Sequence, residues 1–549
     1  MCNEIGFGSN PVSPVVPGTM RSLPLQLLFL AAQAMALRPS RSLAPRMQSA
    51  ATAAVRPEQL PAAAGAEDHR HSATDKMIAW LSQQPGADLS AIKAAPSKLG
   101  EGLCCIVTKA IPAGSLVFSV PCTSCFTLQD AKEDPVWAAL SGVSVNAERA
   151  MTAGTCGTRF KAVLASKLLR GASPYLRSLP HSADELESHP LWWTEEAVGA
   201  LRGTSGLRSV GALCDEVQES IDAWAPALLS AMRATSAADA AVDSNADARS
   251  EALGEAEVAS ALRAAYTLVL SRSFRYDGMG SAALVPVLDL LQHGATPTVL
   301  HAREGDRIVV RARTELHPGD ELVNMYAAKP DFLFATTYGF APNALGADGK
   351  LRLRQRAACC TMLSLNVDEG EPGYDLALLA HEALATSDLG GGEEEEEEAD
   401  AAAWAGHLAA FAASAFLSPW HRPDPLTFGV SVAQLSEGAS VGGSVGALLA
   451  CARLCALTEE EVASEAAREE CFEEVLLGAG RLSDANDARA VTLVLDAAKK
   501  RLAELGRGSA PADGDEASST AALAATLRCS EATALQELIR ALPALFGSA

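Results

Sequence analysis

The sequence predicts an α+β protein in which a small β core is interrupted by a long helical insertion and followed by a helical region. Two stretches with strand-like alternation lie far apart, at 102–121 and 284–326. Alanine-rich sequence with helical character fills about 128–270 and returns after 350. Neither β stretch has enough strands to bury a face alone, so we expect the two to pair across the insertion.

Composition narrows the class of protein. The chain has 549 residues, 48% of them hydrophobic, so it can bury a large core and form two to four domains. Its formal net charge of -23 repels phosphate, which excludes nucleic acid as an expected partner and is compatible with a partner that presents a lysine. Thirteen cysteines lack zinc spacing, since Cys122 and Cys125 have no second pair; we expect no metal and a reducing compartment.

The N-terminus differs from the rest of the chain. Residues 1–56 hold five Arg, no Lys and one acid, Glu4, so this segment carries +4 and the remainder -27. An apolar run at Leu23–Ala36 is too short to span a bilayer but suits a signal sequence. The Arg- and Ser-rich stretch that follows resembles the second part of a bipartite plastid leader. We expect a plastid protein without stable membrane insertion. The alternatives are a cytoplasmic protein, or an initiation codon that has been placed 19 residues upstream of the true start at Met20.

The elements of the first half follow in order. Residues 57–75 are predicted to be a linker, and Asp75 is predicted to cap a helix that runs to Gln83. Strands are expected at Gly102–Thr108 and Ser115–Pro121, because Leu116, Phe118 and Val120 recur at every second position. Residues 232–256 read as a loop or a marginal helix.

The second half begins with a hairpin. Its strands are expected at Thr298–Ala302 and Arg307–Ala312, and a further strand at Glu321–Tyr326. Residues 346–549 are predicted to form an all-α domain. Three glycines and six consecutive glutamates interrupt this region, and such a charge run cannot pack, so 388–400 is predicted to be a solvated loop.

Three blocks carry residue types that suit chemistry. The first is Ser97–Leu103, whose glycines allow close backbone approach; the second joins Ser271–Phe274 to Leu284–His293; the third joins Leu316–Tyr326 to Tyr338–Phe340 and Asn343. Each block alone has an ordinary structural explanation. The first block could be a tight turn, the second a structural Asp and His with satisfied hydrogen bonds, and the third a set of aromatic side chains in the core.

In this order, the blocks resemble those of the SET-domain protein methyltransferases. The subgroup that they resemble contains the Rubisco large-subunit lysine methyltransferase and the actin-histidine methyltransferase. The resemblance covers about 76–345 and implies a SET β core with a pseudoknot. The helical region 346–549 resembles the substrate-binding domain of that subgroup by position and helicity.

The resemblance implies a site for S-adenosylmethionine. Backbone groups near Leu99, Glu101 and Leu103 would cradle it, with Ser271 and Arg272 near its carboxylate. Asp289, Gln292 and His293 would hold its amino and adenine groups. Tyr326 would be the catalytic residue, and Phe274, Asn324 and Tyr338 would line the channel for the substrate side chain.

The chain departs from the pattern at several positions. Gln292 stands where the family has Asn, and its amide lies one methylene further out. Ala327 replaces a frequent Gly, Pro330-Asp331 replaces Ser-Asn, and Asn324 replaces an aliphatic residue. These departures bear on cofactor affinity and on activity.

The function that follows is S-adenosylmethionine-dependent methylation of a lysine on a protein substrate. In-line transfer needs alignment and a neutral amine but no metal. Histidine methylation is the first alternative, although actin-histidine enzymes place Asn at the position of Phe274. A catalytically inactive binding module is the second. These motifs do not encode the protein substrate, the methylation state or the oligomeric state. Rubisco and aldolase are candidate substrates by analogy.

Overall fold

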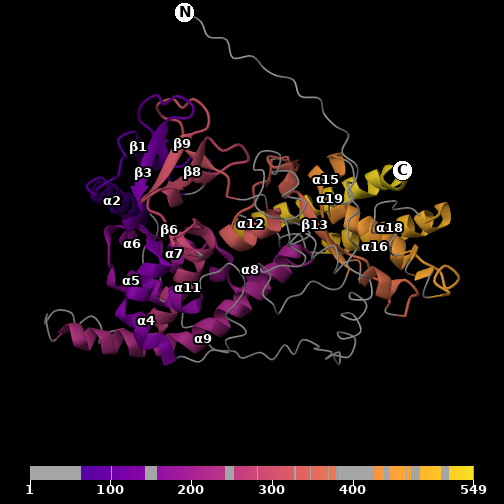
Figure 1. The fold of residues 1–549 in the computed structure, drawn as a ribbon, viewed down its shortest axis with the longest axis horizontal. Helices are drawn as coiled ribbons and strands as arrows, with labels where there is room; N and C mark the ends of the chain where they lie inside the picture. The colour runs from indigo at the N-terminus through magenta and orange to yellow at the C-terminus, as the bar shows by residue number, and fades with distance from the viewer. Residues whose placement is uncertain are drawn as a thin grey trace, which may run out of the picture. The chain divides into compact units, whose positions relative to one another are not determined.

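The computed structural model describes most of the chain from Ala64 onward (Figure 1). The predicted leader 1–56, residues 57–63, Gly100, Glu101 and the predicted acidic loop 388–400 lie outside the described residues. The described ranges are 64–99, 102–142, 157–240, 253–280, 282–326, 329–346, 348–368, 370–378, 380, 426–437, 444–464, 467–468, 470–471, 482–507 and 519–547.

The two predicted β stretches pair across the insertion, as expected. Strand β3 (Leu116–Pro121) pairs with β9 (Arg307–Ala312), which pairs in turn with β8 (Val299–Glu304). Figure 1 shows the early strand β3 beside the later strands β8 and β9. A second small sheet has the order β4-β6-β5, formed by Phe126–Thr127, Ala283–Leu284 and Ser273–Phe274.

Two further strand pairs build the region around the candidate site. Strands β1 (Ile92–Pro96) and β2 (Leu103–Val107) are antiparallel. Strands β7 (Gln292–His293) and β10 (Val323–Asn324) are parallel, with His293 opposite Asn324. The predicted strand Glu321–Tyr326 is therefore only two residues long, and its continuation places Tyr326 next to β7.

The insertion is helical, as predicted. Its main helices are α5 (Thr158–Arg170), α9 (Ser205–Ala240) and α11 (Glu255–Arg272). Their apolar faces join the β strands in one hydrophobic cluster, to which each helix contributes fully buried side chains such as Val163, Leu228 and Leu262. Helix α11 ends at Arg272, so it delivers Ser271 and Arg272 to the β core.

The start of the described part of the chain was predicted wrongly. Helix α2 spans Ala64–Leu81, so residues 64–75 are helix and not linker, and Asp75 lies on its exposed face rather than at its cap. A capping signal at Asp75 does not exclude helix before it, and the segment contains no proline to end one. Strand β1 was missed because its sequence, IKAAP, has a single β-branched residue.

The C-terminal region is mainly helical, but it is not all-α. Strands β13 (Cys360–Ser364) and β14 (Thr427–Ser431) form an antiparallel pair. The two strands are far apart in sequence, and their alanine-rich surroundings give no strand-like pattern that would predict them. The helices are α15 (Val432–Glu437), α16 (Ser444–Cys455), α18 (Asp484–Arg507) and α19 (Ser519–Gly547).

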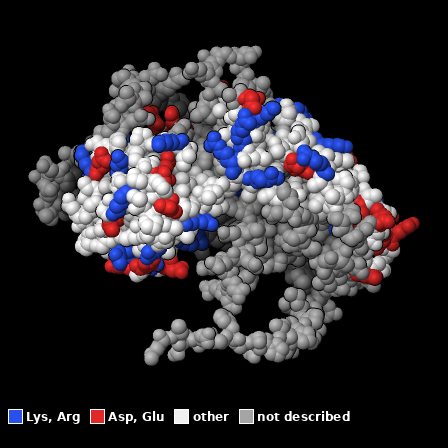
Figure 2. Space-filling view, turned by 90° about the horizontal axis from the view of Figure 1, so that it is seen from above, with Lys and Arg blue, Asp and Glu red and all other residues white. Residues whose placement is uncertain are grey.

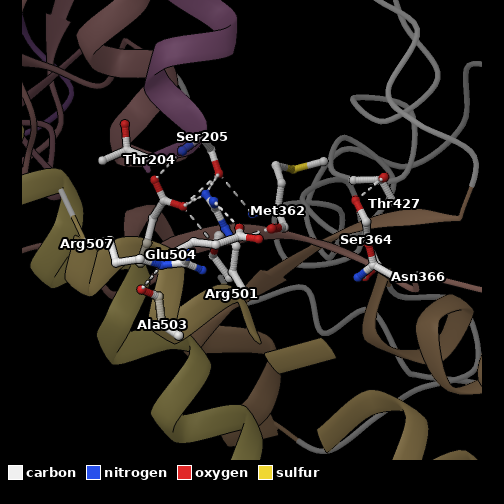
Figure 3. Close-up of polar contacts among 12 residues, drawn as sticks. Thr204, Ser205, Met362, Ser364, Asn366, Thr427, Arg501, Ala503, Glu504 and Arg507 are labelled. Atoms are coloured by element: carbon white, nitrogen blue, oxygen red, sulfur yellow. Dashed lines mark hydrogen bonds and ion pairs between the residues drawn. The ribbon is translucent and has the colours of Figure 1, made fainter. Parts of the chain in front are cut away.

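A buried ion pair ties α9 to the C-terminal helices. The Glu531 carboxylate on α19 accepts hydrogen bonds from the backbone N–H and hydroxyl of Ser205, both at 2.7 Å, and from Thr361 at 2.9 Å. Arg501 on α18 pairs with the same carboxylate at 2.8 Å and donates to the Ser205 hydroxyl. Figure 3 shows Arg501 pointing toward Ser205, with Met362 of β13 alongside.

Within the described residues, no helix has the length and apolar character that crossing a membrane would require. Lys and Arg are interspersed with Asp and Glu on the face shown in Figure 2, and basic side chains gather on part of it.

Candidate active site

A cavity of about 600 Å³ collects nine of the twelve predicted site residues. Its wall is built from the β2 region, the end of α11, the segment from Asp289 to His293, and the aromatic residues that follow β10. The predicted residues that line it are Leu99, Leu103, Ser271, Arg272, Asp289, Gln292, His293, Tyr326 and Tyr338. Glu101 lies outside the described residues. Phe274 and Asn324 do not line this cavity.

Asp289 is held from two sides. The Tyr175 hydroxyl donates to its Oδ2 at 3.1 Å, and the Arg272 guanidinium lies 3.6 Å from the same oxygen. Arg272 also donates to the Asp289 backbone carbonyl at 2.9 Å. Burial raises the pKa of Asp289, while Arg272 and the Tyr175 bond oppose that rise. The carboxylate therefore already has partners within the protein, which places it as a support for Arg272 at the cavity wall.

The turn before Asp289 is strained. Val287 has φ 70 and ψ -43, and the Leu288 N–H donates to the Pro286 carbonyl at 2.8 Å, so Val287 is the centre of a γ-turn. A buried β-branched residue in this conformation is an outlier that surrounding structure must enforce. The turn starts the short 3-10 helix Leu288–Leu290 and carries the Asp289 side chain to Arg272.

Gln292 connects β7 to β2. Its Nε2 donates to the Leu103 carbonyl at 3.1 Å. An Asn at this position would be one methylene shorter, so the longer side chain reaches a carbonyl that Asn could not. Two residues after Gln292 comes Gly294, where an added Cβ would lie 2.5 Å from the Val323 side chain. Glycine is thus required for the close approach of β7 and β10.

His293 has partners at both ring nitrogens. Its Nδ1 accepts the Tyr326 backbone N–H at 3.2 Å, and its Nε2 lies 3.0 Å from the Gln355 side-chain oxygen. Burial lowers the pKa of His293, and the Gln355 bond acts in the opposite direction. The bonds therefore assign a neutral ring with its proton on Nε2.

Tyr326 lies at the centre of an aromatic group. Its hydroxyl donates to the Leu291 carbonyl at 2.7 Å, and the ring lies 5.0 Å from Tyr338 and 5.3 Å from His293. Burial raises the pKa of Tyr326 to about 12. The phenol is therefore protonated near neutral pH, so Tyr326 can present a hydroxyl oxygen but is not a general base at that pH.

Phe274 and Asn324 belong to a neighbouring cluster. The Phe274 ring lies 5.4 Å from His301 and 6.4 Å from Tyr276. The Tyr276 hydroxyl and His301 Nδ1 are 2.7 Å apart, and the Asn324 amide nitrogen is 3.3 Å from His301 Nε2. Tyr338 lies on Tyr326 instead, so the predicted channel residues fall into two groups.

Several residues at or behind the cavity were not predicted. Trp193, Phe340 and Thr526 line it, while Tyr276 and His301 complete the Phe274 cluster and Gln355 supports His293. The Trp193 Nε1 is buried and has no hydrogen-bond partner among the described residues. Phe340 and Tyr276 lie in or next to the motif blocks, but the resemblance gave them no role, and Trp193 and Gln355 are far from the motifs in sequence.

Exposed basic residues lie on or beside the strand that pairs with one strand of the cavity wall, and one of them, Arg352, forms an ion pair with Asp348 at 2.9 Å. Strand β11 (Ala344–Leu345) lines the cavity and pairs with β12 (Leu351–Arg352). On or beside β12 stand exposed basic residues without an intervening acid, namely Lys350, Arg352, Arg354 and Arg356. In the part of the chain that is described, no group of three His, Cys, Asp or Glu side chains could hold a metal ion.

Comparison with known proteins defines the fold. Residues 102–327 match the family model of the SET domain. The predicted fold class is thereby confirmed. No curated protein sequence matches the chain.

Similar solved structures include those of Rubisco LSMT and the LSMT SET domain. One, described as the SET domain of LSMT bound to lysine and AdoHcy, has 15% identity and a TM-score of 0.55 over 86% of this chain and 91% of that chain. Rubisco LSMT bound to sinefungin and monomethyllysine has 17% identity and a TM-score of 0.55, with coverage of 86% and 92%. Rubisco LSMT bound to AdoMet has 16% identity and a TM-score of 0.54, with the same coverage.

Proposed function

We propose that this chain is an S-adenosylmethionine-dependent protein-lysine N-methyltransferase. The observation that carries the proposal is the cavity that brings residues from three separated motifs against Tyr326. Support also comes from the SET domain and from similar structures described as bound to AdoMet, AdoHcy, lysine or monomethyllysine.

The polar groups of the cavity fit this cofactor. Arg272 offers a cation for a carboxylate, the Gln292 amide oxygen offers an acceptor, and the Trp193 Nε1 offers a donor that the described residues leave unused. Phe340 presents an aromatic face, so the cavity combines a charged end with an aromatic end. When bound, S-adenosylmethionine supplies a methyl group on a sulfonium for in-line displacement by the acceptor amine.

The residues of the chain would act by positioning and by excluding water. The Tyr326 hydroxyl is fixed by the Leu291 carbonyl, so its oxygen has a defined place at the end of the aromatic group. Its high pKa keeps it protonated while the acceptor loses a proton to solvent.

Lys329 indicates what these surroundings do to an amine. Its Nζ lies 5.1 Å from the centre of the Tyr338 ring, and burial lowers the pKa of Lys329 to about 8. A substrate lysine that enters the same aromatic surroundings would likewise lose its proton more readily, and the neutral amine is the form that accepts a methyl group.

Histidine methylation is the second candidate, and one observation favours it. The Asn324 amide lies in the Phe274 cluster, so this region does contain an amide that could orient an imidazole. That amide already contacts His301, however, and Phe274 offers only an aromatic face. Peptide arrays with Lys or His at one position decide between the two; transfer to His but not Lys would overturn the lysine assignment.

The inactive-module alternative is tested by binding and turnover together. Isothermal titration with AdoHcy should show binding, and tritiated methyl transfer onto plastid and cytosolic extracts should label a protein whose lysine is then identified by mass spectrometry. Binding without any transfer would favour the module. Rubisco and aldolase are the first acceptors to examine.

We further propose a plastid location, on the basis of the charge and apolar pattern of residues 1–56. A fluorescent protein fused behind these residues should enter plastids. Fluorescence confined to the cytosol would contradict the proposal.

A further inference from the structure

A chain of buried polar side chains runs from the Tyr326 backbone to helix α19. After His293 and Gln355, it continues through Asn343 and Asp331 to Ser530. Gln355, Asn343, Asp331 and Ser530 are each at most 6% exposed. Buried polar groups are costly unless satisfied, so a connected chain of this length beside a candidate active site calls for an explanation.

The first link fixes the ring of His293. A neutral imidazole has one donor nitrogen and one acceptor nitrogen. Because Nδ1 must be unprotonated to accept the Tyr326 N–H, the proton lies on Nε2 and is donated to the Gln355 side-chain oxygen. If Gln355 were removed, the Nε2–H would lose its acceptor and the Tyr326 N–H alone would still favour this tautomer.

The second link fixes Gln355. The Asn343 side chain accepts the Gln355 backbone N–H at 2.9 Å and donates to the Gln355 carbonyl at 3.0 Å, so a single amide holds both backbone groups. Asn343 also lines the cavity. It stands in the third sequence block, where the resemblance gave it no role.

The third link anchors Asn343 on two helices. Asp331, the first residue of α12 (Asp331–Tyr338), accepts bonds from the Asn343 backbone N–H at 3.3 Å and from its side chain at 2.8 Å. Ser530 of α19 donates to the same carboxylate. The C-terminal helix is thus joined by a chain of hydrogen bonds to His293, which accepts the Tyr326 backbone N–H.

We propose that Gln355 is a positioning residue that holds His293 in the Nε2–H tautomer and thereby fixes the Tyr326 backbone, and that Asn343, Asp331 and Ser530 hold Gln355 in place. The proposal rests on the proposed function in that Tyr326 is taken as the catalytic residue. It goes beyond that function by making residues outside the SET-domain match part of the catalytic geometry.

The groups around His293 determine how directly its ring signals report the loss of the Gln355 hydrogen bond. The rings packed on it are Tyr326, Phe334 and Phe340, of which only Tyr326 titrates, with a pKa of about 12. Arg272 and Asp289 act on the Tyr326 hydroxyl, and Asp331 is reached only through Asn343 and Gln355. Apart from burial, the Gln355 bond is what shifts the pKa of His293.

The test uses the full chain and two substitutions of Gln355. Gln355→Met keeps the length of the side chain but removes the acceptor, whereas Gln355→Glu keeps an acceptor and adds charge. The readouts are the ¹⁵N ring signals of His293 in histidine-labelled protein, assigned with His293→Ala, the AdoHcy dissociation constant, and the pH profile of kcat. Gln129→Glu, an exposed position on helix α3 (Leu128–Glu133), controls for added charge.

We expect wild-type His293 to show the Nε2–H tautomer alone, and Gln355→Met to populate the Nδ1–H tautomer as well, because one of the two contacts that select the tautomer is gone. Misplacement of Tyr326 should then lower kcat by about 100-fold. In Gln355→Glu the tautomer should persist at high pH with most of the activity. A nearby carboxylate favours the imidazolium, so the acid limb of the kcat profile should move up by roughly 1–3 pH units. Gln129→Glu should match wild type.

An unchanged His293 tautomer in Gln355→Met would overturn the proposal, as would a Gln355→Glu profile that coincides with wild type. If Gln355→Met does not fold, the profile and ring signals of Gln355→Glu carry the test. The ring signals do not depend on turnover. A protein that methylates nothing, yet populates the Nδ1–H tautomer in Gln355→Met, would contradict the proposed function while supporting the role of Gln355.

Discussion

The hydroxyl of Tyr326 donates a 2.7 Å hydrogen bond to the backbone carbonyl of Leu291. This bond joins the end of β10 to the residue just before β7, and it fixes the phenol oxygen at the wall of the cavity. The residues Asp289, Gln292 and His293, which flank Leu291, line the same wall, so one short segment supports both the candidate catalytic residue and the cofactor side.

Tyr326→Phe removes only this hydroxyl. We expect turnover to fall by at least about 100-fold, the order found when one preorganised donor is lost from an active site, while AdoHcy affinity changes little. Initial rates and isothermal titration provide the measurement. Tyr266→Phe, which loses a hydroxyl contact with Thr158 away from the cavity, is the matched control. A Tyr326→Phe enzyme with the wild-type rate would remove Tyr326 from the mechanism.

Gln292→Asn restores the residue of the family pattern but loses the bond to the Leu103 carbonyl. From sequence alone we would expect Asn to bind the cofactor equally well or better. The structure predicts the reverse: loss of about 1 kcal/mol, or roughly fivefold weaker AdoHcy binding, because the position of β2 depends on the longer side chain. Equal or tighter binding by titration would contradict this dependence.

Glu531 and Glu504 provide a matched pair of acidic residues that pair with Arg501. Figure 3 shows Glu504 beside Arg501. The Glu531 side chain is 2% exposed and that of Glu504 is 39% exposed. Glu531→Ala leaves a buried cation and the Ser205 donors unpaired and should cost about 3–5 kcal/mol of unfolding free energy. Glu504→Ala should cost about 0–1 kcal/mol. Urea denaturation compares them, and similar midpoints would refute the assignment.

His189 should make stability depend on pH. Its ring accepts the Leu191 N–H at Nδ1 and faces the Thr337 carbonyl at Nε2, and burial lowers the pKa of His189 to about 4. The His189 ring binds a proton near pH 6.5 in the unfolded chain but not in the folded chain. The contribution of the neutral ring to folding stability is therefore complete above pH 6.5 and declines as the pH falls toward 4.

The corresponding measurement compares wild type with His189→Gln in urea at pH 7 and pH 4. The stability advantage of wild type should shrink by up to about 3 kcal/mol over this interval, from the shift in pKa at 1.36 kcal/mol per unit. A constant difference between the two proteins would mean that His189 titrates normally in the folded state.

The sequence was most informative where residues are adjacent. The block Leu284–His293 and the residues Tyr326 and Tyr338 were found because their order matches a known pattern, and the structure brings them to one cavity. The pairing of β3 with β9 was predicted because neither β stretch can bury a face alone.

Contacts that depend on tertiary packing could not be predicted. Gln355 supports His293 from 62 positions away, and nothing in its neighbourhood marks it as a partner. Strands β13 and β14 pair across a long separation, and Asp75 resembled a helix cap although the helix passes through it. The placement of Phe274 with His301 also depends on the hairpin β8–β9 and not on the motif that contains Phe274.

The most direct test of the account is transfer of a tritiated methyl group from S-adenosylmethionine to plastid and cytosolic proteins by the purified full chain, with the methylated residue located by mass spectrometry. The account predicts label on a lysine side chain of a protein acceptor, lost with Tyr326→Phe and retained with Tyr266→Phe. Label on histidine alone, or AdoHcy binding without label on any protein, would contradict it.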